Sequence, residues 1–200
     1  MMGYNDFMIN DGLILVDCDG VLLNWELSFD RWVRHYGYVT SEPDLSQYKM
    51  RLRYGFTQDH SDRLVRHFNE SAMMSTLPPL RGAVKYVRKL HDEHGYKFHV
   101  ITSQSNLYQA QQLRIQNLID VFGNVFDGFT ILDCGADKHE GLKPFKNSEC
   151  WWIEDKLQNA LVGKDYGLNS ILINSSYVEK HPDIPILDGW SSIYNYITGE

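Results

Sequence analysis

The 200-residue sequence has few cysteines and no long apolar run. Its three cysteines, Cys18, Cys134 and Cys150, form no CxxC pair, which argues against a disulfide framework and a cysteine-based zinc site. No stretch of about 18 apolar residues occurs, and the first residues, MMGYNDFMINDG, lack the basic start and apolar stretch of a signal peptide. We therefore expect a protein of the reducing cytoplasm that has no membrane partner.

Positive charge is also scarce in this chain. Lys and Arg number 19 against 26 Asp and Glu, which gives a formal net charge of −7. Non-specific binding of extended nucleic acid depends on neutralising many phosphates with Lys and Arg, so this balance argues against it. The eight histidines show no HExxH or other metal-ligand spacing. An anionic substrate would therefore need a local positive site.

What the sequence does contain is an alternation of apolar runs and helical patterns. With 43% hydrophobic and 22% charged residues, the composition is that of an ordinary folded domain. Short apolar runs occur at residues 13–16, 98–101, 129–132, 151–153 and 170–173. Runs of this length between helical segments are typical of parallel strands covered on both faces. The pattern predicts an α/β fold with a Rossmann-like parallel sheet and helices on both faces.

One interval is longer than the others. About 55 residues, from Trp25 to Leu80, separate the first predicted strand from the helix that leads to the second, which is too long for a plain loop. Aromatic and aliphatic residues recur within it at helical spacing. We therefore expect a small helical cap at residues 25–77, inserted above the carboxyl ends of the strands, and a core made of residues 1–24 and 78–200.

Polar side chains follow the predicted strands where each of them ends. They are Asp17 and Asp19, Thr102 and Ser103, Lys138, and Glu154 and Asp155. In a parallel sheet these ends meet along one edge, so carboxylates, hydroxyls and an ammonium group would come together. Carboxylate oxygens are the ligands that Mg²⁺ prefers, and a metal with a lysine and hydroxyls can stabilise a transferring phosphoryl group. The pattern indicates phosphate chemistry at a metal site.

Three ordered motifs strengthen this interpretation. DCDGV at residues 17–21 resembles the first motif of the haloacid dehalogenase-like (HAD) superfamily, VITS at 100–103 its second, and WWIEDK at 151–156 its acidic fourth. The resemblance covers nearly the whole chain and implies a HAD-like fold, with the insertion at the position of that family's cap. It further implies a Mg²⁺-dependent phosphomonoesterase that works through an aspartyl-phosphate.

The resemblance also implies a role for each motif residue. Asp17 would be the nucleophile and a metal ligand, and Asp19 would be the general acid and base and bind the metal through its carbonyl. Gly20, Thr102 and Ser103 would contact the phosphate. Asp155 would bind the metal directly and Glu154 through water. Dehalogenase members of the superfamily lack the second aspartate, so the presence of Asp19 favours phosphate chemistry.

The lysine of the third motif has two candidates in GADKHEGLKPF. Lys138 would open the helix before the fourth motif, which places its ammonium near the strand ends. Lys143 precedes a proline, as the lysine does in many relatives, but only eight residues then reach Trp151. We prefer Lys138 for the phosphate site, and loss of activity in Lys143→Ala with none in Lys138→Ala would reverse that choice.

A narrower resemblance concerns the substrate. LPPLRGAVKYVRKL, the ITS ending and the late GWSSIYNYI are similar to the corresponding places in 5'(3')-deoxyribonucleotidases, which implies a small phosphorylated substrate such as a nucleoside monophosphate. The aromatic residues of the insertion mostly form its core, and Trp25 and Phe29 are the candidates for substrate contact. Arg51 and Arg53 either meet a second phosphate or are surface arginines.

Other functions remain compatible with the same motifs. The chain could dephosphorylate another small metabolite or a nucleic-acid end, or could be a HAD phosphomutase. A catalytically inactive binding protein is the least favoured alternative, because such a relative need not retain Asp17, Asp19, Thr102 and Asp155 together. A homodimer through the cap is allowed, although no feature of the sequence requires it.

Overall fold

The apolar runs of the sequence form the strands at the centre of the fold. The computed structural model describes residues 12–39 and 41–200, so the expectations for residues 1–11 lie outside the described residues: no signal peptide and the start of the core segment 1–24. The strands are β1 (Leu13–Val16), β2 (Lys97–Ser103), β3 (Phe126–Leu132), β4 (Trp151–Glu154), β5 (Asn169–Ile173) and β6 (Ile186–Leu187). Within the described part they pair in the order β3-β2-β1-β4-β5-β6, and every pair is parallel. The predicted α/β class is confirmed.

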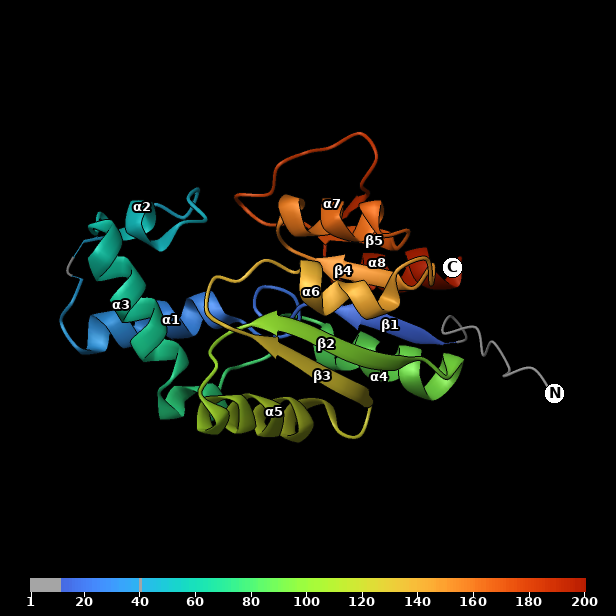
Figure 1. Ribbon diagram of the computed structural model, residues 1–200, viewed down its shortest axis with the longest axis horizontal. Helices are drawn as coiled ribbons and strands as arrows, with labels where there is room; N and C mark the ends of the chain where they lie inside the picture. The colour runs from blue at the N-terminus through green and yellow to red at the C-terminus, as the bar shows by residue number, and fades with distance from the viewer. Residues whose placement is uncertain (1–11, 40) are drawn as a thin grey trace.

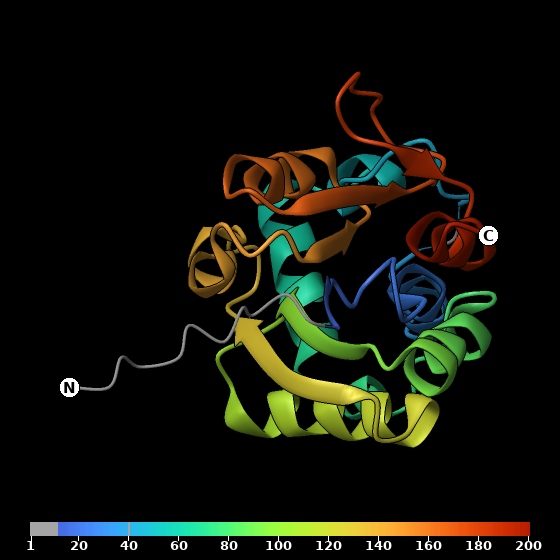
Figure 2. The same cartoon turned by 90° about the vertical axis from the view of Figure 1, so that its right-hand side faces the viewer.

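Helices cover both faces of this sheet. Their bounds are α4 (Ala83–His94), α5 (Tyr108–Phe122), α6 (His139–Leu142) with the short η2 (Lys143–Phe145), α7 (Leu157–Asp165) and α8 (Trp190–Thr198). Helices α4, α5 and α8 lie together on one face, and α6 and α7 lie on the other (Figure 2). Neighbouring parallel strands are joined by crossover connections, and these are almost always right-handed. Helices in connections that run in opposite directions along the sheet therefore lie on opposite faces. The expected layered arrangement is therefore present.

Two local features are not evident from the sequence. Ser105 is of a residue type that often caps a helix, but α5 begins at Tyr108, and the Ser105 hydroxyl accepts a hydrogen bond from the Leu107 backbone N–H at 3.1 Å. The serine therefore stabilises the turn before the helix. The strand β6 was not among the expected ones, because two residues are too few to produce a recognisable period.

The helices between β1 and α4 stand at one end of the sheet. They are α1 (Trp25–His35), α2 (Met50–Tyr54), α3 (Gln58–Asn69) and the short η1 (Ala72–Ser75). Figure 1 shows α1, α2 and α3 beyond the tips of the strands, on the side toward which the arrowheads point. Asn24 starts α1 by accepting a hydrogen bond from the Leu27 N–H at 3.1 Å, which satisfies one of the free donors of the first turn.

The aromatic residues of this segment pack mainly against one another. Trp25 stacks on Phe29 with ring centroids 4.7 Å apart, and Phe68 of α3 meets both rings edge-on at 5.4 Å. These rings share one continuous apolar cluster with Val16, Val100 and Ile153 of the central strands. Burial of each such side chain contributes about 1.5–3 kcal/mol, so the segment is held firmly on the sheet. Among the described residues no helix is long and apolar enough to span a bilayer.

Candidate active site

The strands β1 and β4 lie side by side where the order of the sheet reverses. Chain connections lead away from this point in both directions, so a crevice forms outside the carboxyl ends of the two strands. The Asp17 N–H continues the pairing by donating to the Ile153 carbonyl at 2.9 Å. Oxygens of Asp17, Glu154 and Asp155 consequently lie within 4.8 Å of one another, and all three residues are buried.

Lys138, in the loop between β3 and α6, also contacts Asp17. Its Nζ donates to Asp17 Oδ1 and to the Ile101 carbonyl, each at 2.9 Å, and the side chain is almost completely buried. The Cys18 N–H also donates to Oδ1, at 2.7 Å. Among the described residues no group donates to Asp17 Oδ2, so that oxygen keeps its lone pairs for another partner.

Thr102 and Ser103 end β2 beside these groups, but they differ in their contacts. Thr102 Oγ1 is buried and has no hydrogen-bond partner within the part of the chain that is described. Ser103 Oγ donates to the Ala136 carbonyl at 2.8 Å and so tethers the loop that carries Lys138. Buried hydroxyls are nearly always hydrogen-bonded, so the Thr102 hydroxyl is suited to an incoming oxygen ligand.

Gly20 allows the loop after β1 to pass close to Asp155. Its φ of 78° lies in the left-handed region that favours glycine. A Cβ atom at this position would overlap the Asp155 carboxylate. Glycine is therefore required both for the turn and for the close approach of the first and fourth motifs.

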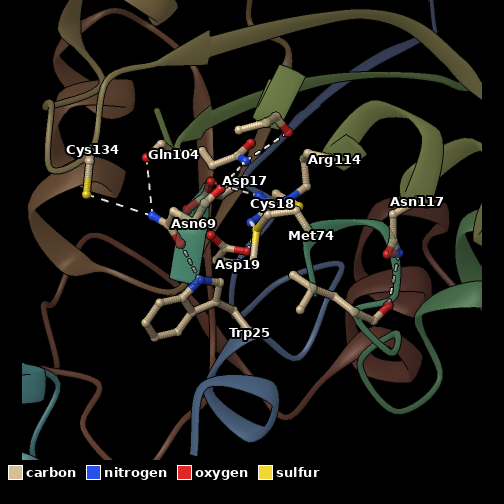
Figure 3. A network of polar contacts seen from close by, with 12 residues as sticks. Asp17, Cys18, Asp19, Trp25, Asn69, Met74, Gln104, Arg114, Asn117 and Cys134 are labelled. Atoms are coloured by element: carbon tan, nitrogen blue, oxygen red, sulfur yellow. Dashed lines mark hydrogen bonds and ion pairs between the residues drawn. The ribbon is translucent and has the colours of Figure 1, made fainter. Parts of the chain in front are cut away.

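Asp19 points to a buried arginine that the sequence analysis did not foresee. Arg114 of α5 donates from Nη1 to Asp19 Oδ1 at 2.5 Å and to Cys18 Sγ at 3.0 Å, and its Nη2 contacts Met74 Sδ at 3.1 Å (Figure 3). Its side chain is fully buried, whereas that of Asp19 is 25% exposed. The guanidinium thus holds the Asp19 carboxylate from behind while leaving its other face open.

Glu154 and Asp155 are anchored differently. Glu154 Oε2 accepts from the backbone N–H groups of Asp155 and Lys156, at 2.8 and 2.7 Å, and Oε1 accepts from Asn159 Nδ2 at 2.6 Å. Asp155 Oδ2 accepts from the Tyr177 hydroxyl at 2.9 Å. Glu154 is therefore largely committed to the turn before α7, and Asp155 retains more freedom to bind a ligand.

The crowding of acids shifts their protonation. Burial, with the nearby charge of Asp17, raises the pKa of Asp155 to about 7, although hydrogen bonds lower it in part. Burial and the charges of Asp17 and Asp155 also raise the pKa of Glu154 well above its ordinary value. Burial raises the pKa of Asp19, and Arg114 opposes that rise. For Lys138, burial lowers the pKa, but the neighbouring Asp17 and Glu154 outweigh it and the net shift is upward.

These groups open into one cavity of about 750 Å³ between the strand ends and the helices α1, α2 and α3. The size falls within the range of small-molecule sites. Trp25 lines the cavity, and its indole N–H donates to Asn69 Oδ1 at 2.8 Å. Asn69 and Gln104 exchange side-chain-to-backbone bonds at 3.2 and 2.9 Å, which ties α3 to the end of β2 (Figure 3).

The remaining candidates lie farther from the cavity. Phe29 is fully buried behind Trp25 and does not line the cavity. The side chain of Lys143 is 67% exposed and pairs with Glu140 at 3.7 Å, so of the two candidate lysines only Lys138 reaches Asp17. Sequence reasoning missed Arg114, Asn69 and Tyr177. Arg114 had a signal, because it is the charged residue four positions from Ala110 and Leu118 on the buried face of α5.

Comparison with known proteins extends these observations. The model of a protein family described as "5' nucleotidase, deoxy (Pyrimidine), cytosolic type C protein" matches residues 11–141. A search of curated protein sequences found no match.

Solved structures with the same fold are numerous. A haloacid dehalogenase-like hydrolase from Streptococcus pneumoniae has a TM-score of 0.64 at 15% identity and covers 93% of this chain and 98% of its own. An L-2-haloacid dehalogenase from Xanthobacter autotrophicus gives 0.63 at 11%, with coverage of 94% and 98%. A D,D-heptose 1,7-bisphosphate phosphatase from B. bronchiseptica, complexed with magnesium and phosphate, gives 0.60 at 10%, also with 94% and 98%. These likenesses show the fold.

Proposed function

The chain belongs to the family of cytosolic type C 5' nucleotidases for deoxy (pyrimidine) nucleotides, a HAD-type family of phosphoric monoester hydrolases, and we propose that it hydrolyses (deoxy)nucleoside monophosphates through a phosphorylated Asp17. The family name also supports a cytosolic location as part of this proposal.

One observation carries the proposal: one carboxylate oxygen of Asp17 accepts two hydrogen bonds, and the other has no donor among the described residues. Lys138 and the Cys18 N–H both bind Oδ1, while Oδ2 is unpartnered among the described residues and the carboxylate lines the cavity. The Thr102 hydroxyl, also without a partner in the described chain, lines the same cavity. A nucleophilic oxygen, an ammonium and a hydroxyl donor are the groups that phosphoryl transfer to a carboxylate requires.

The acidic groups fit a bound Mg²⁺ ion. Three buried carboxylates within 4.8 Å would repel one another when ionised, and burial together with that repulsion raises the pKa values of Glu154 and Asp155. A hard divalent cation removes it, since Mg²⁺ prefers oxygen ligands and keeps several waters. Asp17, Asp155 and the Asp19 carbonyl would hold the ion, with Glu154 acting through water. When bound, Mg²⁺ supplies positive charge that reduces repulsion between Asp17 and the phosphate.

In the first step, Asp17 Oδ2 attacks the phosphorus atom and the bond from phosphorus to the ester oxygen breaks. Asp19 donates its proton to the departing oxygen, so that a neutral alcohol leaves. Burial raises the pKa of Asp19, which favours the protonated carboxyl that this role requires. Lys138 and the Thr102 hydroxyl stabilise the charge on the transferring phosphoryl oxygens.

In the second step, Asp19, now ionised, removes a proton from water. The water oxygen attacks the phosphorus of the aspartyl-phosphate, inorganic phosphate leaves, and the Asp17 carboxylate is regenerated. Arg114 keeps Asp19 in one orientation through both steps, because its guanidinium bonds to the carboxylate from the buried side.

We further propose that residues 25–77 act as a cap that selects the alcohol part of the substrate, while residues 1–24 and 78–200 form the catalytic core. Trp25 is 8% exposed and lines the cavity, where its ring could contact a nucleobase, and Phe29 stacks on it. Specificity would then depend on the insertion, and the chemistry on the strand ends.

A substrate panel tests this proposal. Purified protein with Mg²⁺ is expected to release inorganic phosphate from deoxynucleoside monophosphates faster than from sugar phosphates or phosphorylated oligonucleotide ends. Equal, slow release from all of them would refute the nucleotidase assignment and leave a general phosphatase. Formation of an isomeric phosphate ester without free phosphate would indicate a phosphomutase instead.

A further inference from the structure

One wall of the active-site cavity carries cations that the proposed mechanism does not use. Lys49 and Arg51, at the start of α2, and Lys156, directly after Asp155, all line the cavity. Lys49 and Arg51 belong to the insertion and Lys156 to the core, so both segments contribute cations to the cavity. This cationic wall lies in a chain whose net charge is −7.

The cationic wall has no acidic partner. Among the described residues no carboxylate oxygen comes within 4.0 Å of the side-chain nitrogens of Lys49, Arg51 or Lys156. The other two cations of the cavity are paired: Lys138 with Asp17 at 2.9 Å, and Arg66 with Asp133 at 3.3 Å. The three unpaired cations are thus free to bind an anion that enters the cavity.

The position of the cationic wall is fixed by an aromatic contact. Lys156 Nζ lies 5.6 Å from the centre of the Tyr48 ring, and Tyr48 in turn packs edge-on against Tyr177 at 5.2 Å. Since Tyr48 directly precedes Lys49, these contacts bring the start of α2 to the Asp155 side of the site. Tyr177 also bonds to Asp155, so the wall adjoins the proposed metal site.

The opposite wall has a different character. It is formed by α3 and presents Gln58, Ser61 and Asp62 to the cavity, with Gln58 donating to Asp62 at 2.7 Å. An acidic group on that side repels a phosphate, whereas amide and hydroxyl groups suit a neutral, hydrogen-bonding ring. The other charged groups that line the cavity from the insertion are paired, Arg66 with Asp133 at 3.3 Å and Glu26 with Arg53 at 2.8 Å, so the unpaired positive charge lies with Lys49, Arg51 and Lys156.

We propose that the cationic wall binds a second phosphate group on the substrate, so that the preferred substrate is a nucleoside 3',5'-bisphosphate and not a simple monophosphate. This inference rests on the proposed function and refines its substrate class. One phosphate is cleaved at Asp17, the nucleoside lies along Trp25 and α3, and the second phosphate contacts Lys49, Arg51 and Lys156. A simple nucleoside monophosphate leaves these cations unused.

The first test compares kcat/KM for 2'-deoxyuridine 3',5'-bisphosphate and 2'-deoxyuridine 5'-monophosphate, with initial phosphate release as the readout. Charge-assisted hydrogen bonds predict a preference for the bisphosphate of about tenfold or more. Equal values for the two substrates would overturn the inference and leave the nucleotidase proposal intact. Release from neither substrate would overturn both.

Variants of the cationic wall test which residues cause the preference for the bisphosphate. In the Lys49→Ala, Arg51→Ala double variant the ratio of the two kcat/KM values is expected to fall about tenfold, because the lost charges contact only the second phosphate. The single variant Arg51→Lys, which keeps the charge, is expected to retain most of the preference. Arg31→Ala is the matched control, because Arg31 is an exposed cation of the same insertion that lies outside the cavity.

A general electrostatic attraction gives a different result. Steering by net charge weakens steeply with salt and acts before binding. If steering is the cause, the ratio should fall in Arg31→Ala by about as much per charge removed as in the double variant, and that outcome would overturn the proposed subsite. A fall confined to the double variant, with its melting temperature near that of the unmodified protein, supports it.

Discussion

The Arg114 guanidinium lies directly behind the Asp19 carboxylate, with Nη1 2.5 Å from Oδ1. The same nitrogen contacts the Cys18 sulfur at 3.0 Å, and burial raises the pKa of the Cys18 thiol to about 12. Cys18 therefore stays a neutral thiol and leaves Asp19 as the acidic partner of the arginine. The ion pair links α5 to the loop after β1 and sets the direction of a side chain that has to move a proton.

The first prediction concerns Arg114→Met, which removes the group that orients the Asp19 carboxylate. The variant keeps the apolar volume but leaves Asp19 without its buried partner, which should lower the free energy of unfolding by about 2 kcal/mol. Misorientation of Asp19 should lower kcat by about 10- to 100-fold. Steady-state kinetics and chemical denaturation measure the two effects.

Arg88→Met provides the control for this prediction. Arg88 also bonds to α5, through the Phe122 and Val121 carbonyls, but it lies away from the cavity. Its loss should reduce stability and leave kcat unchanged. An unchanged kcat in Arg114→Met would show that Arg114 has only a structural role.

The second prediction concerns the two lysines. Lys138→Met removes the ammonium that binds Asp17 Oδ1, and we expect kcat to fall by about 10²–10³-fold, as for the loss of one group that stabilises transition-state charge. Lys143→Ala should leave kcat within about twofold, because exposed ion pairs contribute little. The reverse pattern in phosphate-release assays would move the phosphate contact to Lys143.

The sequence predicted the sheet and much of the site for identifiable reasons. Buried parallel strands are continuous apolar runs, and Asp17 and Asp155 directly follow two of them, so their meeting at the sheet edge could be foreseen. The starting residue of α5 could not, because Ser105 satisfies a turn instead of a helix end. Tyr177 has no sequence signal, since the loop that carries it has no periodicity and its contact with Asp155 depends on the whole fold.

Arg114 shows more clearly what could not be predicted from the sequence. A charged residue on the buried face of a helix indicates a partner, but the sequence does not identify that partner among 26 acidic residues. Only the packing of α5 against η1 and the loop after β1 selects Asp19. The meeting of polar groups at the strand ends was therefore predictable, and the contacts that orient them were not.

The third prediction follows from the raised pKa of Asp155, about 7 in the folded chain against 3.8 in its ordinary state. The folded metal-free protein holds a proton that the unfolded chain releases, so this contribution to stability is present below about pH 4 and is lost as pH rises through about 7. We expect the melting temperature of metal-free protein to fall between pH 5 and 8, and Mg²⁺ to restore it most at pH 8.

The Asp155→Asn variant is the reference for that measurement, because other groups also titrate. When the melting temperature of Asp155→Asn is subtracted from that of the unmodified protein at each pH, the difference without metal should fall as the pH rises. The melting temperature of the variant should change little when Mg²⁺ is added. A difference profile that rises from pH 5 to pH 8 would contradict the proposed crowding of carboxylates. Thermal melting with a chelator and with added Mg²⁺ supplies both profiles.

The fourth prediction concerns Tyr177, whose hydroxyl donates to Asp155 Oδ2 at 2.9 Å. In Tyr177→Phe the carboxylate loses a partner that orients it and lowers its pKa. We expect the Mg²⁺ concentration for half-maximal activity to rise about tenfold, as for partners of metal-binding residues generally. Tyr166→Phe, outside the cavity, should leave it unchanged, and an equal effect in both variants would argue against a specific role.

The central claim is that Asp17 carries the phosphoryl group. The direct test mixes the protein with a deoxynucleoside monophosphate and Mg²⁺, quenches the mixture in acid within the first turnover, and maps the peptides by mass spectrometry. We predict that the peptide containing Asp17 gains the mass of one phosphoryl group, and that Asp17→Asn neither gains it nor releases phosphate. Phosphate release by Asp17→Asn at the rate of the unmodified protein, or a phosphoryl group on another residue, would contradict the account.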